Sequence, residues 1–139
     1  MNPQDNVKIV QQVYENFQKG NIPALLKSLT DNVEWELPEV ENVPIAGKRQ
    51  GRDRVADFFS ELNETQETID FIPRDFIAQG EKVVVLGSYT WRVKASGGRF
   101  TSDWAHVFTL RDGRIERFQE YTDTAAVAAA YKEQRTQAA

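Results

Sequence analysis

The segment Asp103–Asp123, with the sequence DWAHVFTLRDGRIERFQEYTD, decides the fold that we expect for this chain. Asp112-Gly113 is a turn signal, because glycine tolerates the positive φ that short hairpin loops require. On both sides of the turn, bulky apolar residues alternate with other residues. Successive side chains of a strand point to opposite faces, so this alternation predicts two strands. The segment is therefore predicted to be a β-hairpin.

The inward face of this hairpin is expected to bring two titratable residues together. His106 is the only histidine of the chain and lies among bulky apolar residues, and Glu120 lies near the end of the second strand. If the two inward faces coincide, both side chains point into one hydrophobic space. The expected inward residues are Trp104, His106, Phe108 and Leu110 with Glu116, Phe118 and Glu120; the opposite face has Ile115, Arg117, Gln119 and Tyr121 on the second strand.

The segments before the hairpin also predict strands. Residues 83–94 carry the longest strand signal, with Tyr89 and Trp91 on one face, and residues 33–37 alternate around Trp35. Residues 68–78 are predicted to form a strand at a sheet edge or with a bulge, because Pro73 lacks the N–H that a central strand needs. Turns are expected at 79–81 and 95–98, where glycines occur.

Helices are predicted at both ends of the chain. Asn2-Pro3 is a helix start, and apolar residues then recur at helical spacing as far as Gly20. A short helix from Pro23 carries three leucines as far as Leu29, a third begins at Gly51, and the last spans 124–134 after a cap at 122 or 123. Helices followed by turn-linked strands indicate one α+β domain, residues 1–139, with a curved antiparallel sheet packed against helices.

Residues 39–50 show neither the helical nor the strand-like spacing of apolar residues. They are predicted to be a loop, a candidate lid over a pocket.

The composition excludes several classes of protein. The chain has 139 residues and a net charge of −4, whereas a nucleic-acid partner requires a basic surface. We see no apolar run long enough to cross a membrane and no signal-peptide layout, so the expected location is cytoplasmic. With one histidine and no cysteine, no metal site is expected.

Three stretches of the sequence carry a family resemblance. They are DNVEWELP at 31–38, an Ala-Gly-x-x-x-Gly-Arg pattern at 46–52, and the segment 103–124. Together they resemble the SnoaL-like group of the nuclear-transport-factor-2-like superfamily, which also contains ketosteroid isomerase and limonene epoxide hydrolase. The resemblance implies a cone-shaped α+β barrel, no cofactor, and a homodimer. This fold hosts isomerases, cyclases, dehydratases, hydrolases and non-catalytic binders, so it does not specify a reaction.

The catalytic residues of the two named enzymes are mostly not matched here. The base of ketosteroid isomerase falls at Leu37, its tyrosine falls nearest Val13 with Tyr14 adjacent, and its protonated aspartate falls at His106. For limonene epoxide hydrolase, Glu120 falls near one acid, but no inward arginine or second aspartate matches. Steroid isomerisation of the usual kind is therefore not expected.

Two main hypotheses about function follow. The first is a cofactor-independent enzyme that does acid–base chemistry on a small apolar molecule, with His106 moving a proton and Glu120 fixing its tautomer. The second is a pocket that binds or carries such a molecule without catalysis; a scaffold that mainly dimerises is a third. Each of these residues could also have only a structural role, either in the hydrophobic core or on the solvent-exposed surface. The expected substrate-binding residues are Trp104, Phe118, Trp35, Trp91, Tyr14, Leu37, Phe108 and Tyr89.

The opposite face of the predicted sheet is apolar as well. A contiguous apolar face is unfavourable in water, so sheet-to-sheet contact in a homodimer is expected to cover it. The residues expected on this face are Val84, Leu86, Ala105, Val107, Ile115 and Tyr121.

Overall fold

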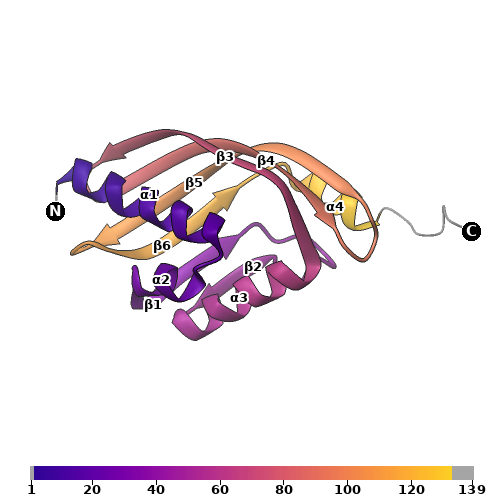
Figure 1. The fold of residues 1–139 in the computed structure, drawn as a ribbon, viewed down its shortest axis with the longest axis horizontal. Coiled ribbons are helices and arrows are strands. Elements are labelled where there is room, and N and C mark those ends of the chain that lie inside the picture. Colours follow the sequence, from indigo (N-terminus) through magenta and orange to yellow (C-terminus); the bar gives the residue numbers. More distant parts are fainter. Residues whose placement is uncertain (1, 133–139) are drawn as a thin grey trace, which may run out of the picture.

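The computed structural model describes residues 2–132 and confirms the predicted α+β fold (Figure 1). Within these residues, four helices and six strands follow one another. Their bounds are α1 Pro3–Lys19, α2 Ile22–Lys27, β1 Leu29–Leu37, β2 Gly47–Gln50, α3 Arg52–Thr65, β3 Gln66–Gln79, β4 Lys82–Val93, β5 Arg99–Arg111, β6 Arg114–Tyr121 and α4 Thr124–Lys132.

The strands form one curved, unclosed sheet in the order β2-β1-β6-β5-β4-β3. The sheet was expected to be antiparallel, and this is wrong at one pairing, because β1 runs parallel to β6. This pairing joins the first strand of the described residues to β6, their last strand. Helix α1 packs on β3 and β4, α3 packs on β1 and β2, and α4 contacts β5 (Figure 1). The helices and the concave side of the sheet enclose the core.

The hairpin β5–β6 turns at Asp112-Gly113 as predicted, with φ of 49° and 81° at these two residues. Its register shifts between Thr109 and Leu110, so that Ile115 pairs with Leu110 while Arg117 pairs with Thr109. The extra residue, Glu116, reverses the alternation along β6. Ile115 is therefore fully buried, and its expected place on the outer face is wrong. Glu116, which was expected to point inward, instead forms an ion pair with Arg111, with 3.1 Å between the nitrogen and oxygen atoms.

The segment 39–50 is a loop only in its first part. Residues 47–50 form β2, which pairs with β1, so the loop prediction is wrong there. Strand β2 has the sequence GKRQ, which carries no apolar alternation, because it is a sheet edge held mainly by backbone pairing. Arg49 anchors it through an ion pair of 2.6 Å with Glu61 on α3. Strand β3 lies at the other edge, with a register shift between Pro73 and Asp75, as the proline predicted.

The helix ends largely follow the sequence signals. The Asn2 side chain accepts a hydrogen bond from the Asp5 N–H at 2.9 Å, and Asp123 caps α4 by accepting one from Ala126 at 3.0 Å. Leu29, expected on the second helix, is instead the buried first residue of β1. Residues 133 and 134 of the predicted last helix lie outside the described residues.

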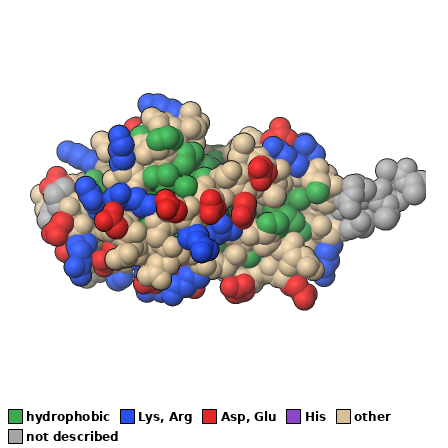
Figure 2. All heavy atoms as spheres, turned by 90° about the horizontal axis from the view of Figure 1, so that it is seen from below, with side chains coloured by type: hydrophobic (Ala, Val, Ile, Leu, Met, Phe, Trp, Pro, Cys, Tyr) green, Lys and Arg blue, Asp and Glu red, His purple; other side chains and the backbone are tan. Residues whose placement is uncertain are grey.

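The surface carries both signs of charge. On the face in Figure 2, acidic and basic side chains alternate around small groups of hydrophobic ones, without a large area of a single sign. Within residues 2–132, no helix is long and apolar enough to cross a membrane.

Candidate functional site

A cavity lies between the concave face of the sheet and the helices. Its free volume is about 90 Å³, and its wall is almost entirely apolar and aromatic. A dry apolar cavity of roughly 150 Å³ takes up benzene, so a ligand of that size or larger requires the wall to widen. Nine of the ten predicted site residues line it: Tyr14, Trp35, Leu37, Tyr89, Trp91, His106, Phe108, Phe118 and Glu120.

Three of these side chains form a hydrogen-bonded chain. His106 Nε2 lies 3.0 Å from Glu120 Oε1, as expected for residues that face each other across β5 and β6. His106 Nδ1 lies 2.7 Å from the Tyr14 hydroxyl on α1. Both ring nitrogens of His106 are therefore bonded to protein side chains. The resulting chain is Glu120–His106–Tyr14, and all three side chains line the cavity.

The protonation state of this chain follows from its surroundings. Burial lowers the pKa of His106 below its usual value, and this outweighs the hydrogen bond and the charge of Glu120, which both raise it. In the neutral imidazole only one nitrogen carries a proton. An ionised carboxylate only accepts hydrogen bonds, so Nε2–H donates to Glu120, and Nδ1 accepts from the Tyr14 hydroxyl. Burial and the nearby Glu120 raise the pKa of Tyr14, which keeps the phenol protonated.

Trp104 does not line the cavity, contrary to expectation. Its indole stacks on the His106 ring, with the two ring centroids 3.9 Å apart and the planes 18° apart. The indole fits because its cross-strand neighbour on β4 is Gly87. A Cβ atom on Gly87 would lie 2.5 Å from Trp104 Cζ2 and 2.5 Å from the Ile72 carbonyl oxygen. Trp104 therefore packs against a face of the imidazole ring and is not part of the cavity wall.

A second hydrogen-bonded chain begins at Tyr89, which also lines the cavity. The Tyr89 hydroxyl donates to Thr122 Oγ1 at 2.7 Å, and Thr122 donates to Ser102 Oγ at 3.1 Å. Ser102 donates to the Asp103 carbonyl oxygen at 2.6 Å and accepts from the Asp123 N–H. Burial and Glu120 raise the pKa of Tyr89, although the Thr122 bond opposes this. The same carboxylate thus acts on Tyr14 and Tyr89.

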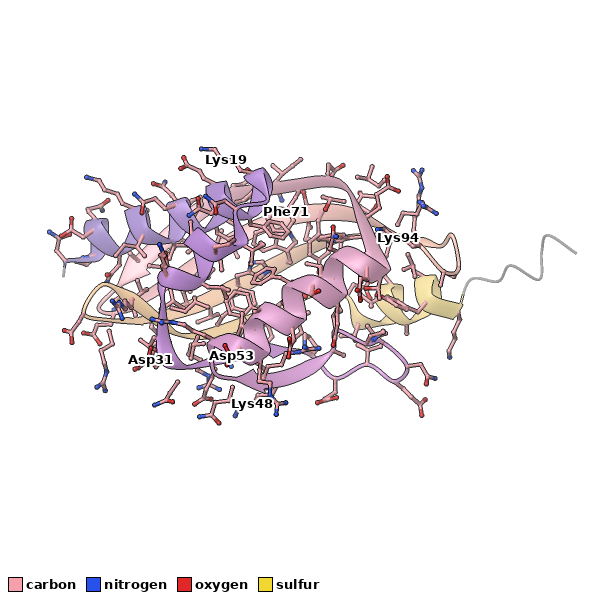
Figure 3. All side chains as sticks on the ribbon, turned by 60° about the horizontal axis from the view of Figure 1, so that its bottom comes forward. Lys19, Asp31, Lys48, Asp53, Phe71 and Lys94 are labelled. Atoms are coloured by element: carbon pink, nitrogen blue, oxygen red, sulfur yellow. The ribbon has the colours of Figure 1, made fainter. Side chains whose placement is uncertain are left out.

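Several lining residues were not predicted from the sequence. Phe71 on β3 points inward between α1 and the sheet, whereas the labelled lysines lie at the periphery (Figure 3). Its ring lies 6.0 Å from those of Tyr14 and Tyr89. The segment 38–46 supplies a side wall through Val43, Ile45 and neighbouring residues, so the candidate lid is part of the site, while its movement stays a prediction. The other unpredicted lining residues are Val13, Phe17, Leu25, Phe58, Phe59, Leu62, Gln66, Phe100, Thr122, Thr124 and Val127.

Among residues 2–132, no three acidic or histidine side chains cluster as metal ligands. The chemistry that the described side chains offer is hydrogen bonding and proton transfer.

The lowered pKa of His106 predicts a specific pH dependence of stability. Below pH 6.5 the unfolded chain binds a proton at this residue while the folded chain does not. The stability due to neutral His106 is thus fully present above pH 6.5 and is lost as the pH falls toward the lower folded-state pKa. Compared with His106→Gln, the parent should lose up to about 1.4 kcal/mol of stability per pH unit in this window. Urea unfolding of both proteins from pH 7.5 to 4.5 measures the difference, and parallel curves would contradict it.

Comparison with known proteins identifies the family. Among solved structures, a nuclear-transport-factor-2-like (NTF2-like) protein from Burkholderia xenovorans LB400 is similar at 34% identity over 94% of this chain and 98% of that chain, with a TM-score of 0.85. The architecture is thus that of an NTF2-like protein. A family model for the SnoaL-like domain matches residues 10–118. The chain belongs to the SnoaL-like family, as its sequence motifs indicated.

Two further solved structures are informative about the range of this fold. TerC, co-crystallised with polyporic acid, is similar at 27% identity over 92% of this chain and 98% of that chain, with a TM-score of 0.82. A protein from Bacillus subtilis described as a candidate isomerase is similar at 17% identity over 96% of this chain and 98% of that chain, with a TM-score of 0.79. At that identity the likeness shows the fold alone. No match was found among curated proteins.

Proposed function

We propose that this protein is a cofactor-independent enzyme that transfers a proton on a small, largely apolar molecule bound in the cavity. The observation that supports this most is the chain Glu120–His106–Tyr14, which lines an aromatic pocket. Titratable groups buried together in an apolar pocket are the usual arrangement of an acid–base site. The similarity to TerC, co-crystallised with polyporic acid, supports an organic small molecule as the occupant.

The geometry suggests how the proton moves. The Tyr14 oxygen takes a proton from the substrate as the Tyr14 hydroxyl proton passes to His106 Nδ1. A substrate C–H or O–H bond breaks, an O–H bond forms on Tyr14, and the electron pair stays on the substrate. The resulting imidazolium is stabilised by Glu120, which already accepts the Nε2–H. Return of the proton to another atom of the substrate completes an isomerisation without any cofactor.

The test is proton exchange on probe ketones. We expect the protein to accelerate exchange of the α-hydrogens of α-hydroxy ketones such as 2-hydroxy-1-indanone with D₂O, followed by NMR at pH 8. His106→Gln should lose the acceleration, whereas Lys48→Gln on the exposed edge strand should keep it. Binding of the probes with exchange no faster than in buffer would contradict the proposal.

The alternative is a binding or carrier protein with the same pocket. One observation favours it: both ring nitrogens of His106 are already bonded to protein groups. In that case Tyr14 and Glu120 fix the polar end of the ligand, and the probes bind without exchange.

We also propose that a second copy of this chain covers the outer face of the sheet. Two rows of side chains cross this face in register: Ile77–Val84–Val107 and Leu86–Ala105–Tyr121. Leu86 and Tyr121 are 39% and 53% exposed, which is unfavourable for large apolar side chains at the centre of a sheet.

The expected mass in solution is therefore twice the monomer mass of 15.9 kDa. Leu86→Lys puts a charge in the middle of the face and should give the monomer in light scattering at micromolar concentration. The matched change Ile22→Lys, on α2 away from this face, should leave the dimer intact. A parent protein that is monomeric at 100 μM would contradict the proposal.

A further inference from the structure

In both hydrogen-bonded chains at the cavity, the tyrosine donates its hydroxyl proton to the next protein group of the chain. This direction of donation limits which ligands the cavity can bind. In the first chain, Glu120 only accepts, so His106 donates to it, and Tyr14 donates to His106. The single hydroxyl proton of Tyr14 is thereby engaged with a protein atom. Its oxygen keeps lone pairs but has no proton to offer a ligand.

In the second chain, the direction of each hydrogen bond follows from the group farthest from the cavity, the Asp103 carbonyl. The Asp103 carbonyl oxygen only accepts, so the one hydroxyl proton of Ser102 is engaged there at 2.6 Å. Thr122 must then donate to Ser102, and Tyr89 must donate to Thr122, because each hydroxyl has one proton. The Tyr89 oxygen is consequently also an acceptor without a free proton.

Both phenols belong to one polar end of the cavity. The Glu120 carboxylate acts electrostatically on both hydroxyls, and both phenol rings lie 6.0 Å from the rings of Phe71 and Trp104. Tyr14 and Tyr89 are only 6% and 3% exposed, so bulk water does not compete at this end. The polar end therefore presents two phenol oxygens and a carboxylate, all of which are acceptors.

We infer that the cavity selects molecules that donate a hydrogen bond at this end, namely alcohols, phenols or enols, over molecules that only accept one. This inference deepens the proposed function and rests on the same site. A ligand that brings only a carbonyl or ether oxygen meets acceptors, and both partners then lose their hydrogen bonds to water. A ligand hydroxyl satisfies the acceptors and places its own proton beside the Tyr14 oxygen.

The wall also contains donors outside the two chains, namely the Trp35 indole, the Thr124 hydroxyl and the Gln66 amide. The Trp35 indole N–H has no acceptor among the described residues, although the side chain is 4% exposed. Trp35 stacks on Phe118 and belongs to neither hydrogen-bonded chain. A probe pair in which both molecules carry an oxygen atom but only one carries an O–H donor separates the preference of the polar end from any effect of Trp35, and a methyl-bearing probe without oxygen controls for the added methyl group.

The experiment compares phenol, anisole and toluene by calorimetry or ligand-observed NMR at pH 8. We expect phenol to bind at least about tenfold more tightly than anisole, a difference of about 1.4 kcal/mol. Anisole should bind no better than toluene. Anisole binding as tightly as phenol would overturn the inference.

A variant that replaces an acceptor by a donor sharpens the test. Glu120→Gln puts an amide N–H₂ at the polar end and should lower the ratio of phenol to anisole affinity at least threefold. Glu116→Gln makes the same change four residues earlier, at an exposed ion pair, and should keep the ratio. If the Glu120→Gln protein does not fold, Tyr89→Phe is the substitute variant. It removes one acceptor and should weaken the binding of phenol but not that of anisole. Unchanged ratios in both variants would overturn the inference.

The outcome is separable from that of the proposed function. A phenol preference without proton exchange on the ketones supports the inference and contradicts the enzyme. Exchange without a phenol preference supports the enzyme and overturns the inference.

Discussion

Replacement of Tyr14 by phenylalanine is expected to lower the rate of probe exchange by about 10²- to 10⁴-fold, the usual contribution of a positioned acid–base group. The hydroxyl oxygen is the only heavy atom removed, and it lies 2.7 Å from His106 Nδ1. The aromatic ring remains, so its packing against Phe71, Phe76 and Phe108 is retained. The measurement is the exchange rate by NMR, with circular dichroism as the check on folding.

The matched control is Tyr121→Phe, which removes a hydroxyl from an exposed tyrosine on the outer face. The Tyr121→Phe protein should accelerate hydrogen exchange on the probe ketones as much as the parent protein does. A Tyr14→Phe protein that is folded and keeps more than a third of the parent rate would show that the proton does not pass through this phenol.

The second large effect is expected at Gly87. Substitution by alanine adds a methyl group that meets the Trp104 ring and the Ile72 carbonyl oxygen, both at 2.5 Å. The backbone carbonyl belongs to the paired strand β3 and moves only with that strand. We expect Gly87→Ala to destabilise the fold by about 1–3 kcal/mol, the usual cost of overpacking. Because Trp104 stacks on His106, the exchange activity should fall as well.

Thermal and urea unfolding measure the effect. Ser88→Ala, at the next position of β4 and on its outer side, should change stability by no more than about 0.5 kcal/mol. Equal melting temperatures for Gly87→Ala and the parent would mean that Trp104 and β3 yield easily, and that Trp104 does not hold His106 rigidly.

The local patterns of the sequence predicted the parts of the fold that depend on neighbouring residues. The Asp112-Gly113 turn and the two-residue period around it placed His106 and Glu120 opposite each other, which the register confirms. They failed at Ile115, because a bulge depends on how two strands pair and leaves no mark in either strand alone. They also failed at β2, whose charged edge sequence resembles a loop.

The site was harder to predict wherever it depends on contacts between distant parts of the chain. The bond from Tyr14 to His106 joins residues 92 positions apart and depends on how α1 lies across the sheet. The family resemblance placed the tyrosine of related enzymes nearest Val13, yet Tyr14 points to the imidazole. Phe71 was missed because two register shifts in β3, near Thr68 and Pro73, interrupt the alternation that would have identified it.

The parallel pairing of β1 with β6 has a consequence for biosynthesis. Trp35 on β1 pairs with Phe118, so one edge of β1 has no partner until the ribosome has made the end of the sheet. Its other edge is covered early by β2, whose lysine and arginine discourage association. During translation, the unpaired edge exposes the backbone N–H and C=O groups of β1 to other nascent chains. We therefore expect the unfinished chain to need a chaperone more than the finished protein does.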